Sequence, residues 1–226
     1  MALKDLLRFE NDAWQQGYTA VAGMDEAGRG PIAGPVTAAA VILPREKQVE
    51  GLNDSKLLTP SVREKLAEIL QNSSDVVSAV ESVSPAEIDQ LNILQATYLA
   101  MTRALNALTT TPDFVLVDGN SVPRIKTAAK AVVKGDSRSA NIAAASILAK
   151  VTRDRIMEKA AADFPGYGFE KHKGYATSDH IAALEQLGPC SLHRKSFTPV
   201  SRIINHNLYQ PELFPSENGY IAKKSC

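Results

Sequence analysis

The strongest constraint on the fold is the order of apolar runs along the 226-residue chain. Glycines and prolines at 28–35 predict a tight bend between the first two runs, which favours an antiparallel pair. The later runs are separated by helical segments, so crossover connections and parallel pairing are expected there. The predicted strands are 19–24, 36–43, 76–83, 114–117 and 131–133. The order predicts an α/β fold, a mixed five-stranded sheet flanked by helices.

Helical periodicity fills the intervals between these strands. Thr59 and Pro60 are typical of a helix start, and the helix should end near Gln71. Ser84 and Glu87 have capping-box spacing, and the apolar stripe that follows runs to Leu108, which predicts one long helix. Further helices are predicted at 3–17, 139–162, 177–187 and from 199 onward. We expect residues 1–203 to form one domain with a helical C-terminal extension, and residues 204–226 an irregular tail.

Composition narrows the classes of function. The formal net charge is zero, which argues against a histone-like nucleic-acid binder. Residues 119–160 nevertheless carry nine Lys and Arg against three Asp and Glu, which fits either a basic groove or a solvated helix face. No apolar stretch approaches the ~18 residues of a membrane span, and the N-terminus lacks an export signal. We expect a cytoplasmic monomer without membrane association, its two cysteines forming no disulfide framework.

Carboxylates follow three of the predicted strands. Asp25 and Glu26 follow the first, Asp118 the fourth and Asp136 the fifth. Parallel strands end at one edge of a sheet, where α/β folds bind ligands, so we expect these side chains to converge. Their repulsion and their all-oxygen chemistry favour Mg²⁺ or Mn²⁺, and two such ions suit phosphoryl transfer. Adjacent strand residues point to opposite faces, so Glu26 is expected at the strand end. Each acid alone could instead be a turn or cap residue.

Polar loops add candidate substrate contacts. The glycine pair at 28 and 30 permits close backbone approach to a phosphate or sugar, although its spacing is not that of a P-loop and a plain turn is the alternative. Segments 171–175 and 192–197 interleave cations with aromatics, which suits phosphate contact with stacking or a solvated basic loop. The candidate contacts are Gly28, Arg29, Gly30, Asn53, Ser55, Lys56 and Tyr175. The histidines lack metal-ligand spacing, and surface or capping roles are expected for His172, His180, His193 and His206.

In combination, these motifs resemble the type 2 ribonuclease H family. The matching segments, in the family's order, are 21–31, 34–36, 53–56, 117–119, 134–137, 143–151, 173–175 and 193–197. The resemblance covers about residues 17–203 and implies a ribonuclease H-like fold. It also implies an endonuclease that cleaves the RNA strand of RNA·DNA hybrids and incises 5′ of single ribonucleotides in duplex DNA. The implied products carry a 5′-phosphate and a 3′-hydroxyl.

The resemblance also implies roles for individual residues. The metal-binding catalytic set, holding two Mg²⁺ or Mn²⁺ ions, is Asp25, Glu26, Asp118 and Asp136. The motif that senses the ribose 2′-hydroxyl is Gly28, Arg29 and Gly30. Tyr175 matches the tyrosine that stacks on the sugar at the RNA-to-DNA junction. The segment that contacts the substrate backbone contributes Asn53, Ser55 and Lys56. A replication or repair protein partner stays unassigned.

Three alternatives remain open from the residues themselves. Another carboxylate-metal nuclease of the same fold, such as a junction resolvase, would share the acidic cluster but not the dependence on a 2′-hydroxyl. A noncatalytic hybrid-binding module would keep the basic groove and need no acidic cluster. A small-molecule phosphohydrolase would need a closed pocket and would release free phosphate.

Overall fold

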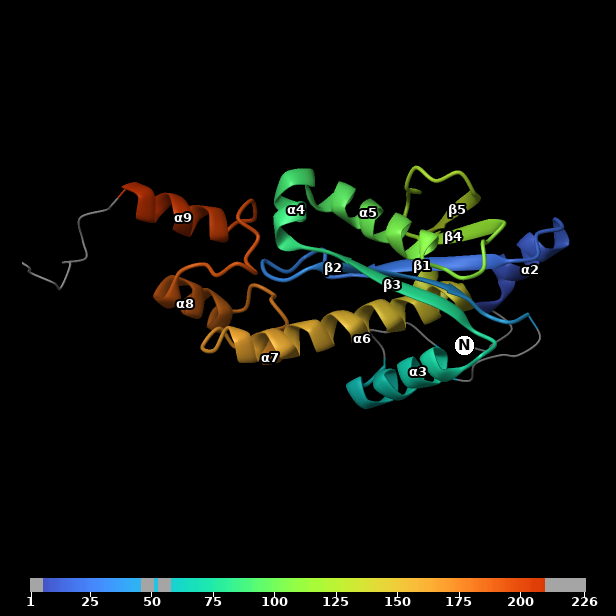
Figure 1. Ribbon diagram of the computed structural model, residues 1–226, viewed down its shortest axis with the longest axis horizontal. Helices are drawn as coiled ribbons and strands as arrows, with labels where there is room; N and C mark the ends of the chain where they lie inside the picture. Colours follow the sequence, from blue (N-terminus) through green and yellow to red (C-terminus); the bar gives the residue numbers. More distant parts are fainter. Residues whose placement is uncertain (1–5, 46–50, 53–57, 210–226) are drawn as a thin grey trace, which may run out of the picture.

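The centre of the molecule is a five-stranded mixed sheet (Figure 1). The computed structural model describes residues 6–45, 51–52 and 58–209. The strands, in sheet order, are β3 (Val77–Val83), β2 (Val36–Ile42), β1 (Val21–Ala27), β4 (Phe114–Asp118) and β5 (Ala128–Val132). β1 pairs antiparallel with β2 and parallel with β4, β2 pairs antiparallel with β3, and β4 pairs parallel with β5. The predicted mixed sheet is confirmed. The last strand begins three residues earlier than expected and ends at Val132, and the first strand continues to Ala27, so Asp25 and Glu26 lie within it.

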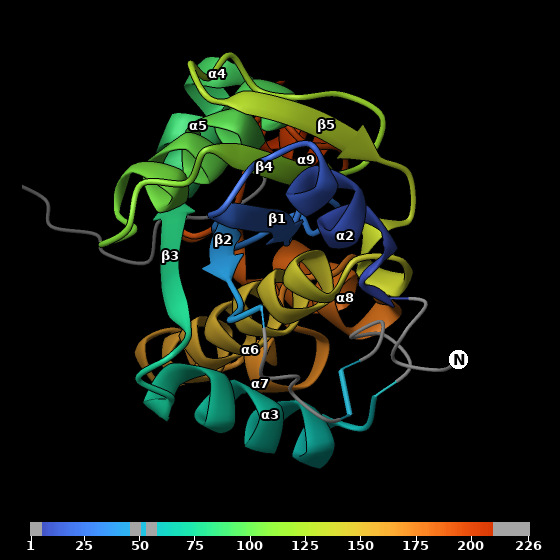
Figure 2. The same ribbon diagram turned by 90° about the vertical axis from the view of Figure 1, so that its right-hand side faces the viewer.

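Helices lie on both faces of this sheet and beyond one end of it (Figure 1). In chain order they are α2 (Arg8–Gln15), α3 (Pro60–Asn72), α4 (Pro85–Leu91), α5 (Ile93–Asn106), α6 (Ala140–Asp163), α7 (Phe169–His172), α8 (Ser178–Leu187) and α9 (Val200–Tyr209). Figures 1 and 2 show α5 on one face and α6 on the other, with α3 packed outside α6. In the described part of the chain, no helix is both long and apolar enough to cross a membrane.

Small side chains allow both helices to lie close to the sheet. In β2, Ala38 and Ala40 pack in the core under α5, whereas Ala39 and Val41 pack in the core under α6. This alternation is the period of two expected of a strand buried on both faces. Gly23 of β1 is a point of close backbone contact, because a Cβ there would lie 2.2 Å from the backbone carbon of Asn141. The start of α6 therefore rests directly on β1.

A buried acid from α2 holds the N-terminus of α6. Glu10 Oε1 accepts hydrogen bonds from Ser139 Oγ at 2.6 Å and from the Asn141 amide at 3.0 Å. Asn141 in turn donates from Nδ2 to the Val21 carbonyl at 2.8 Å. Glu10 is fully buried, and burial raises the pKa of its carboxyl. Among the described residues, its second oxygen, Oε2, has no hydrogen-bond partner.

We expect Glu10→Gln to be at least as stable as the unaltered protein at pH 7.5. The amide keeps the accepting oxygen and removes a buried charge, whose desolvation opposes folding. Because the pKa of Glu10 is raised in the fold, the unaltered protein loses stability from this group as pH rises through that pKa, and Glu10→Gln should not. Urea unfolding at pH 5 and 7.5 measures both effects. Glu10→Ala, which loses both hydrogen bonds, should be destabilised by about 2 kcal/mol; an equal loss in Glu10→Gln would contradict the argument.

The long helix predicted from Ser84 to Leu108 is wrong, because it is broken at Asn92. This residue has a positive φ of 70° with ψ 162°, and its Oδ1 accepts from the amides of Leu94 and Gln95. Asn92 therefore ends α4 and caps α5. The apolar stripe continues through both helices, which is why periodicity alone joined them.

The C-terminal segments pack against the end of α6 and the bend at 28–35. Backbone hydrogen bonds join the Ile32 amide to the Gly174 carbonyl at 2.9 Å and the Arg194 amide to the Ile32 carbonyl at 2.9 Å. Helix α7 was not predicted, and α9 continues to Tyr209, past the expected boundary at residue 203. The rest of the predicted tail, 210–226, lies outside the described residues.

Candidate active site

The two central parallel strands bring Asp25 and Asp118 to the same edge of the sheet. β1 and β4 pair as far as Met24 and Val117, so the next residue of each strand is an aspartate. Asp25 Oδ1 accepts from the Glu26 amide at 2.7 Å, and Asp118 Oδ1 accepts from the Gly135 amide at 2.6 Å. Parallel register thus places two carboxylates side by side where ligands bind in α/β sheets.

A cavity of about 270 Å³ opens at this edge. It is lined by Asp25, Glu26, Ala27, Arg29, Gly30, Asp118, Ser146, Lys150 and Tyr175. The predicted convergence of Asp25, Glu26 and Asp118 is therefore present, and Glu26 is the penultimate residue of β1, as expected. Asp136 lies in the short 3₁₀ turn Gly135–Ser137, where it is buried close enough to act electrostatically on Asp25 without lining the cavity.

The acidic cluster is electrostatically costly. Burial raises the pKa of Asp25 well above its usual value, and the charges of Glu26, Asp118 and Asp136 raise it further. An all-oxygen donor set of this kind fits a hard divalent cation, whose charge would offset the repulsion. Across the part of the chain that the structure describes, no three acidic, histidine or cysteine side chains lie close enough together to form a metal cage. The all-oxygen chemistry of the acids that line the cavity fits an ion.

Two buried arginines hold the bend that borders the cavity. Arg194 is fully buried and donates to the carbonyls of Gly28 at 2.6 Å and Arg29 at 3.1 Å, and also to those of Gly34 and Pro35. Burial and the nearby charge of Arg153 lower the pKa of Arg194 to about 9, so it stays a cation at neutral pH. A fork of N–H donors suits such an array of carbonyl oxygens.

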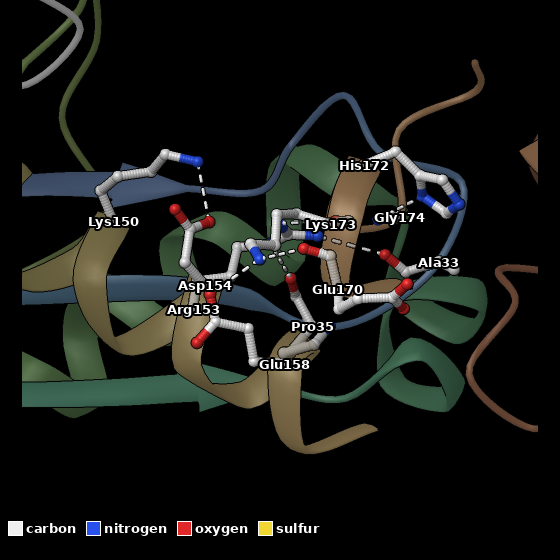
Figure 3. A network of polar contacts seen from close by, with 10 residues as sticks. All are labelled: Ala33, Pro35, Lys150, Arg153, Asp154, Glu158, Glu170, His172, Lys173 and Gly174. Carbon is white, nitrogen blue, oxygen red and sulfur yellow. Dashed lines mark hydrogen bonds and ion pairs between the residues drawn. The ribbon is translucent and has the colours of Figure 1, made fainter. Parts of the chain in front are cut away.

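Arg153 of α6 joins the bend to the segment that carries Tyr175. Its guanidinium donates to the carbonyls of Pro35 at 2.9 Å, Ala33 at 3.1 Å and Lys173 at 3.0 Å (Figure 3). Gly28 has φ 95°, and a Cβ there would lie 2.0 Å from Arg153 Nε, so only glycine fits. The arginine thereby fixes the spacing of the two predicted substrate loops.

The bend at 28–35 and the segment that carries Tyr175 each place an exposed side chain at the cavity. Tyr175 is 46% exposed, and its Cε1 would lie 3.7 Å from a Cβ built on Gly30. Arg29 is also exposed and pairs with Glu26 at 3.3 Å. The structure therefore brings Arg29, Gly30 and Tyr175 beside the carboxylates, with Gly28 beneath them in the bend. The other predicted contacts lie outside the described residues, namely Asn53, Ser55 and Lys56.

Sequence reasoning missed two cavity residues on α6. Ser146 and Lys150 are four residues apart, so they share one face of the helix. Lys150 Nζ donates to Asp154 Oδ1 at 2.8 Å (Figure 3). Both lie in the motif at 143–151, and their spacing of four residues on a predicted helix could have indicated that they face the acidic edge together.

A sheet of this order with carboxylates at the ends of its central strands defines a ribonuclease H-like nuclease. The ribonuclease H2 of Pyrococcus horikoshii superposes with a TM-score of 0.71 at 30% identity, covering 83% of this chain and 98% of that chain. A PCNA complex of ribonuclease HII from Archaeoglobus fulgidus gives 0.67 at 27% identity, covering 79% and 95%.

Sequence comparison narrows the class to one family. The ribonuclease HII of Chlamydia trachomatis is 52% identical over 202 residues, which cover 89% of this chain and 93% of that protein. That of an Anaeromyxobacter species is 49% identical over 212 residues, covering 94% and 67%. The family model described as ribonuclease HII matches residues 22–200. The chain belongs to the ribonuclease HII family, and it is an RNase H endonuclease acting on RNA in RNA·DNA hybrids.

Proposed function

We propose that this chain cleaves long RNA·DNA hybrids and also incises duplex DNA 5′ of a single embedded ribonucleotide, leaving a 5′-phosphate and a 3′-hydroxyl. The observation that carries the proposal is the shared cavity: three carboxylates line it together with Gly30 and Tyr175. A phosphodiester placed against the acids would therefore have its sugar within reach of both substrate loops. We propose that the protein acts as a monomer.

The acidic edge is proposed as the site of hydrolysis. Enzymes of this family depend on divalent metal ions. The residues proposed to hold two Mg²⁺ or Mn²⁺ ions are Asp25, Glu26, Asp118 and Asp136. When bound, the ions supply Lewis-acid activation of water and neutralise the charge that develops on the phosphate. Asp25 and Asp118 lie on neighbouring strands, and the amides of Glu26 and Gly135 fix the carboxylates that would hold the ions against the reacting phosphate.

The loop at 28–30 is proposed to read the ribose 2′-hydroxyl. A 2′-hydroxyl both donates and accepts hydrogen bonds. The backbone carbonyls and amides of a glycine-rich bend can accept from it and donate to it. Arg194 donates to the carbonyls of Gly28 and Arg29 and so holds this part of the bend, while Gly30 lines the cavity. Arg29 can exchange its exposed ion pair with Glu26 for a phosphate contact at little cost.

The Tyr175 ring is proposed to stack on the sugar at the junction between RNA and DNA. Its exposure beside Gly30 leaves an apolar ring face at the cavity rim. We also retain Asn53, Ser55 and Lys56 as proposed contacts to the substrate backbone, on the basis of the sequence alone.

The proposal is tested by mapping the cut in an end-labelled DNA duplex that holds one ribonucleotide. With Mg²⁺ or Mn²⁺ we expect a single incision 5′ of the ribonucleotide, products with a 5′-phosphate and a 3′-hydroxyl, and no cutting in chelator. An RNA·DNA hybrid should be cut at many positions. Cutting of an all-DNA duplex would favour the resolvase-like alternative, and tight binding without metal-dependent turnover would favour the binding module.

A further inference from the structure

Three histidines form a compact cluster behind Tyr175. His180 and His193 are fully buried, and the His172 ring stacks on His180 with centroids 4.2 Å apart. The expected surface or capping roles are thus wrong for His180 and His193, because their rings lie in the interior around Phe169. The side chain of His206 is not among those that the structure describes. Three neighbouring imidazoles can coexist only if their protonation states are compatible.

The hydrogen bonds settle which nitrogen of each buried ring carries the proton. The Cys190 amide donates to His193 Nδ1 at 3.0 Å, so that nitrogen is an acceptor and the proton of neutral His193 is on Nε2. His193 Nε2 lies 3.1 Å from His180 Nε2 and therefore donates to it. His180 then carries its proton on Nδ1, which donates to the Tyr175 carbonyl at 2.8 Å. The chain of donors runs in one direction from the Cys190 amide to Tyr175.

This series of hydrogen bonds requires both buried histidines to be neutral, and their surroundings favour the neutral form. Burial and the neighbouring histidines lower the pKa of His193 to about 4, and burial lowers that of His180. A second proton on either ring would place two donors against each other, at the Cys190 amide or between the two Nε2 atoms. At neutral pH both rings therefore keep the tautomers assigned above.

His172 holds the same segment from the other side. Its Nε2 lies 2.8 Å from the Tyr167 carbonyl and so carries the proton. Its Nδ1 accepts from the Gly174 amide at 3.2 Å (Figure 3). The segment also contains two left-handed residues, Lys173 with φ 51° and Gly174 with φ 86°. Such a conformation persists only where surrounding contacts determine it.

We propose that His180, held in one tautomer by His193, is a positioning residue that fixes the Tyr175 backbone and so aims the exposed tyrosine ring at the sugar of the ribonucleotide. The Tyr175 ring is half exposed and so has few neighbours to hold it. Its direction is therefore set mainly by the backbone of Tyr175. The inference rests on the proposed function, in which Tyr175 stacks at the RNA-to-DNA junction.

Two substitutions of His180 distinguish the effect of its hydrogen bond to the Tyr175 carbonyl from the effect of losing the imidazole ring. The amide nitrogen of asparagine falls near the place of Nδ1, so His180→Asn can still donate to the Tyr175 carbonyl. The amide of glutamine falls near Nε2, so His180→Gln loses that bond and can keep the one to His193. We expect His180→Gln to lower kcat/KM on a duplex with one ribonucleotide by about tenfold, and His180→Asn to restore most of it. Circular dichroism and thermal unfolding verify that both variants are folded under assay conditions.

A double-mutant cycle with Tyr175→Ala shows whether the effect passes through the tyrosine. If His180 acts by aiming Tyr175, His180→Gln should cause no further loss in the Tyr175→Ala background. An equal tenfold loss in both backgrounds, or His180→Asn as impaired as His180→Gln, would overturn the inference and leave the proposed function standing. If Tyr175→Ala cleaves as fast as the unaltered protein, the stacking role fails, and the inference fails with it.

Discussion

Asp25→Asn and Asp118→Asn are each expected to reduce hydrolysis by about 10³-fold or more while preserving the fold. Each substitution removes a carboxylate from the acidic edge and so weakens the electrostatic stabilisation of the reacting phosphate, which is worth several kcal/mol in metal-assisted hydrolysis. The structural cost should be small, because asparagine is nearly isosteric and its oxygen can accept from the Glu26 or Gly135 amide. At Asp25 the substitution also removes a buried charge that its neighbours repel.

Single-turnover cleavage at saturating Mg²⁺ or Mn²⁺, alongside thermal unfolding, measures both parts of this prediction. Asp163→Asn is the matched control, since Asp163 is exposed at the end of α6 and should leave both quantities unchanged. Retained turnover in either site variant with metal saturating would refute the assignment of the acidic edge.

Arg194→Met is expected to destabilise the protein by about 3 kcal/mol or more and to abolish selective incision. The substitution leaves the buried carbonyls of Gly28 and Gly34 without their donor, and unsatisfied buried acceptors cost about 1–3 kcal/mol each before relaxation. The Pro35 carbonyl keeps its hydrogen bond from Arg153. Arg194→Lys should be intermediate, because an ammonium cannot span the same acceptors. Without these hydrogen bonds the bend at 28–35 would no longer be held in place, and the substrate loop at 28–30 would lose its conformation.

Urea unfolding gives the free energy, and the ratio of cleavage on ribonucleotide-containing and long hybrid substrates reports the shape of the loop. Arg202→Met, at an exposed position of α9, serves as the control and should stay within about 0.5 kcal/mol. If Arg194→Met unfolds at the same urea concentration as the unaltered protein, the bend does not depend on this cation.

The sheet could be predicted because its signals are local. The bend after β1, the strand periodicity and the helical crossover each follow from residues close in sequence, and together they imply mixed pairing. The break at Asn92 could not be predicted, because the apolar stripe continues across it and the decisive feature is the positive φ of one residue.

The acidic part of the site was also predictable, since strand-end carboxylates must meet when strands are parallel. The buried arginines were not, because arginine is ordinarily exposed and the acceptors of Arg194 are backbone carbonyls some 160 positions away. His180 and His193 are closer in sequence to their partners, each other and the Tyr175 carbonyl, but no apolar periodicity or metal-ligand spacing indicates these contacts. Contacts of side chains to distant backbone leave no periodic trace in a sequence.

We expect hydrolysis at the acidic edge to depend on a 2′-hydroxyl that the neighbouring loops read. The most direct test compares two duplexes that differ only in one sugar, a ribonucleotide or its 2′-deoxy counterpart, cleaved by the same preparation with Mg²⁺ or Mn²⁺. We predict incision 5′ of the ribonucleotide and at least about 10³-fold slower cutting at the deoxy position, because the loop's polar groups would be left unpaired. Comparable cutting of both duplexes would contradict the account.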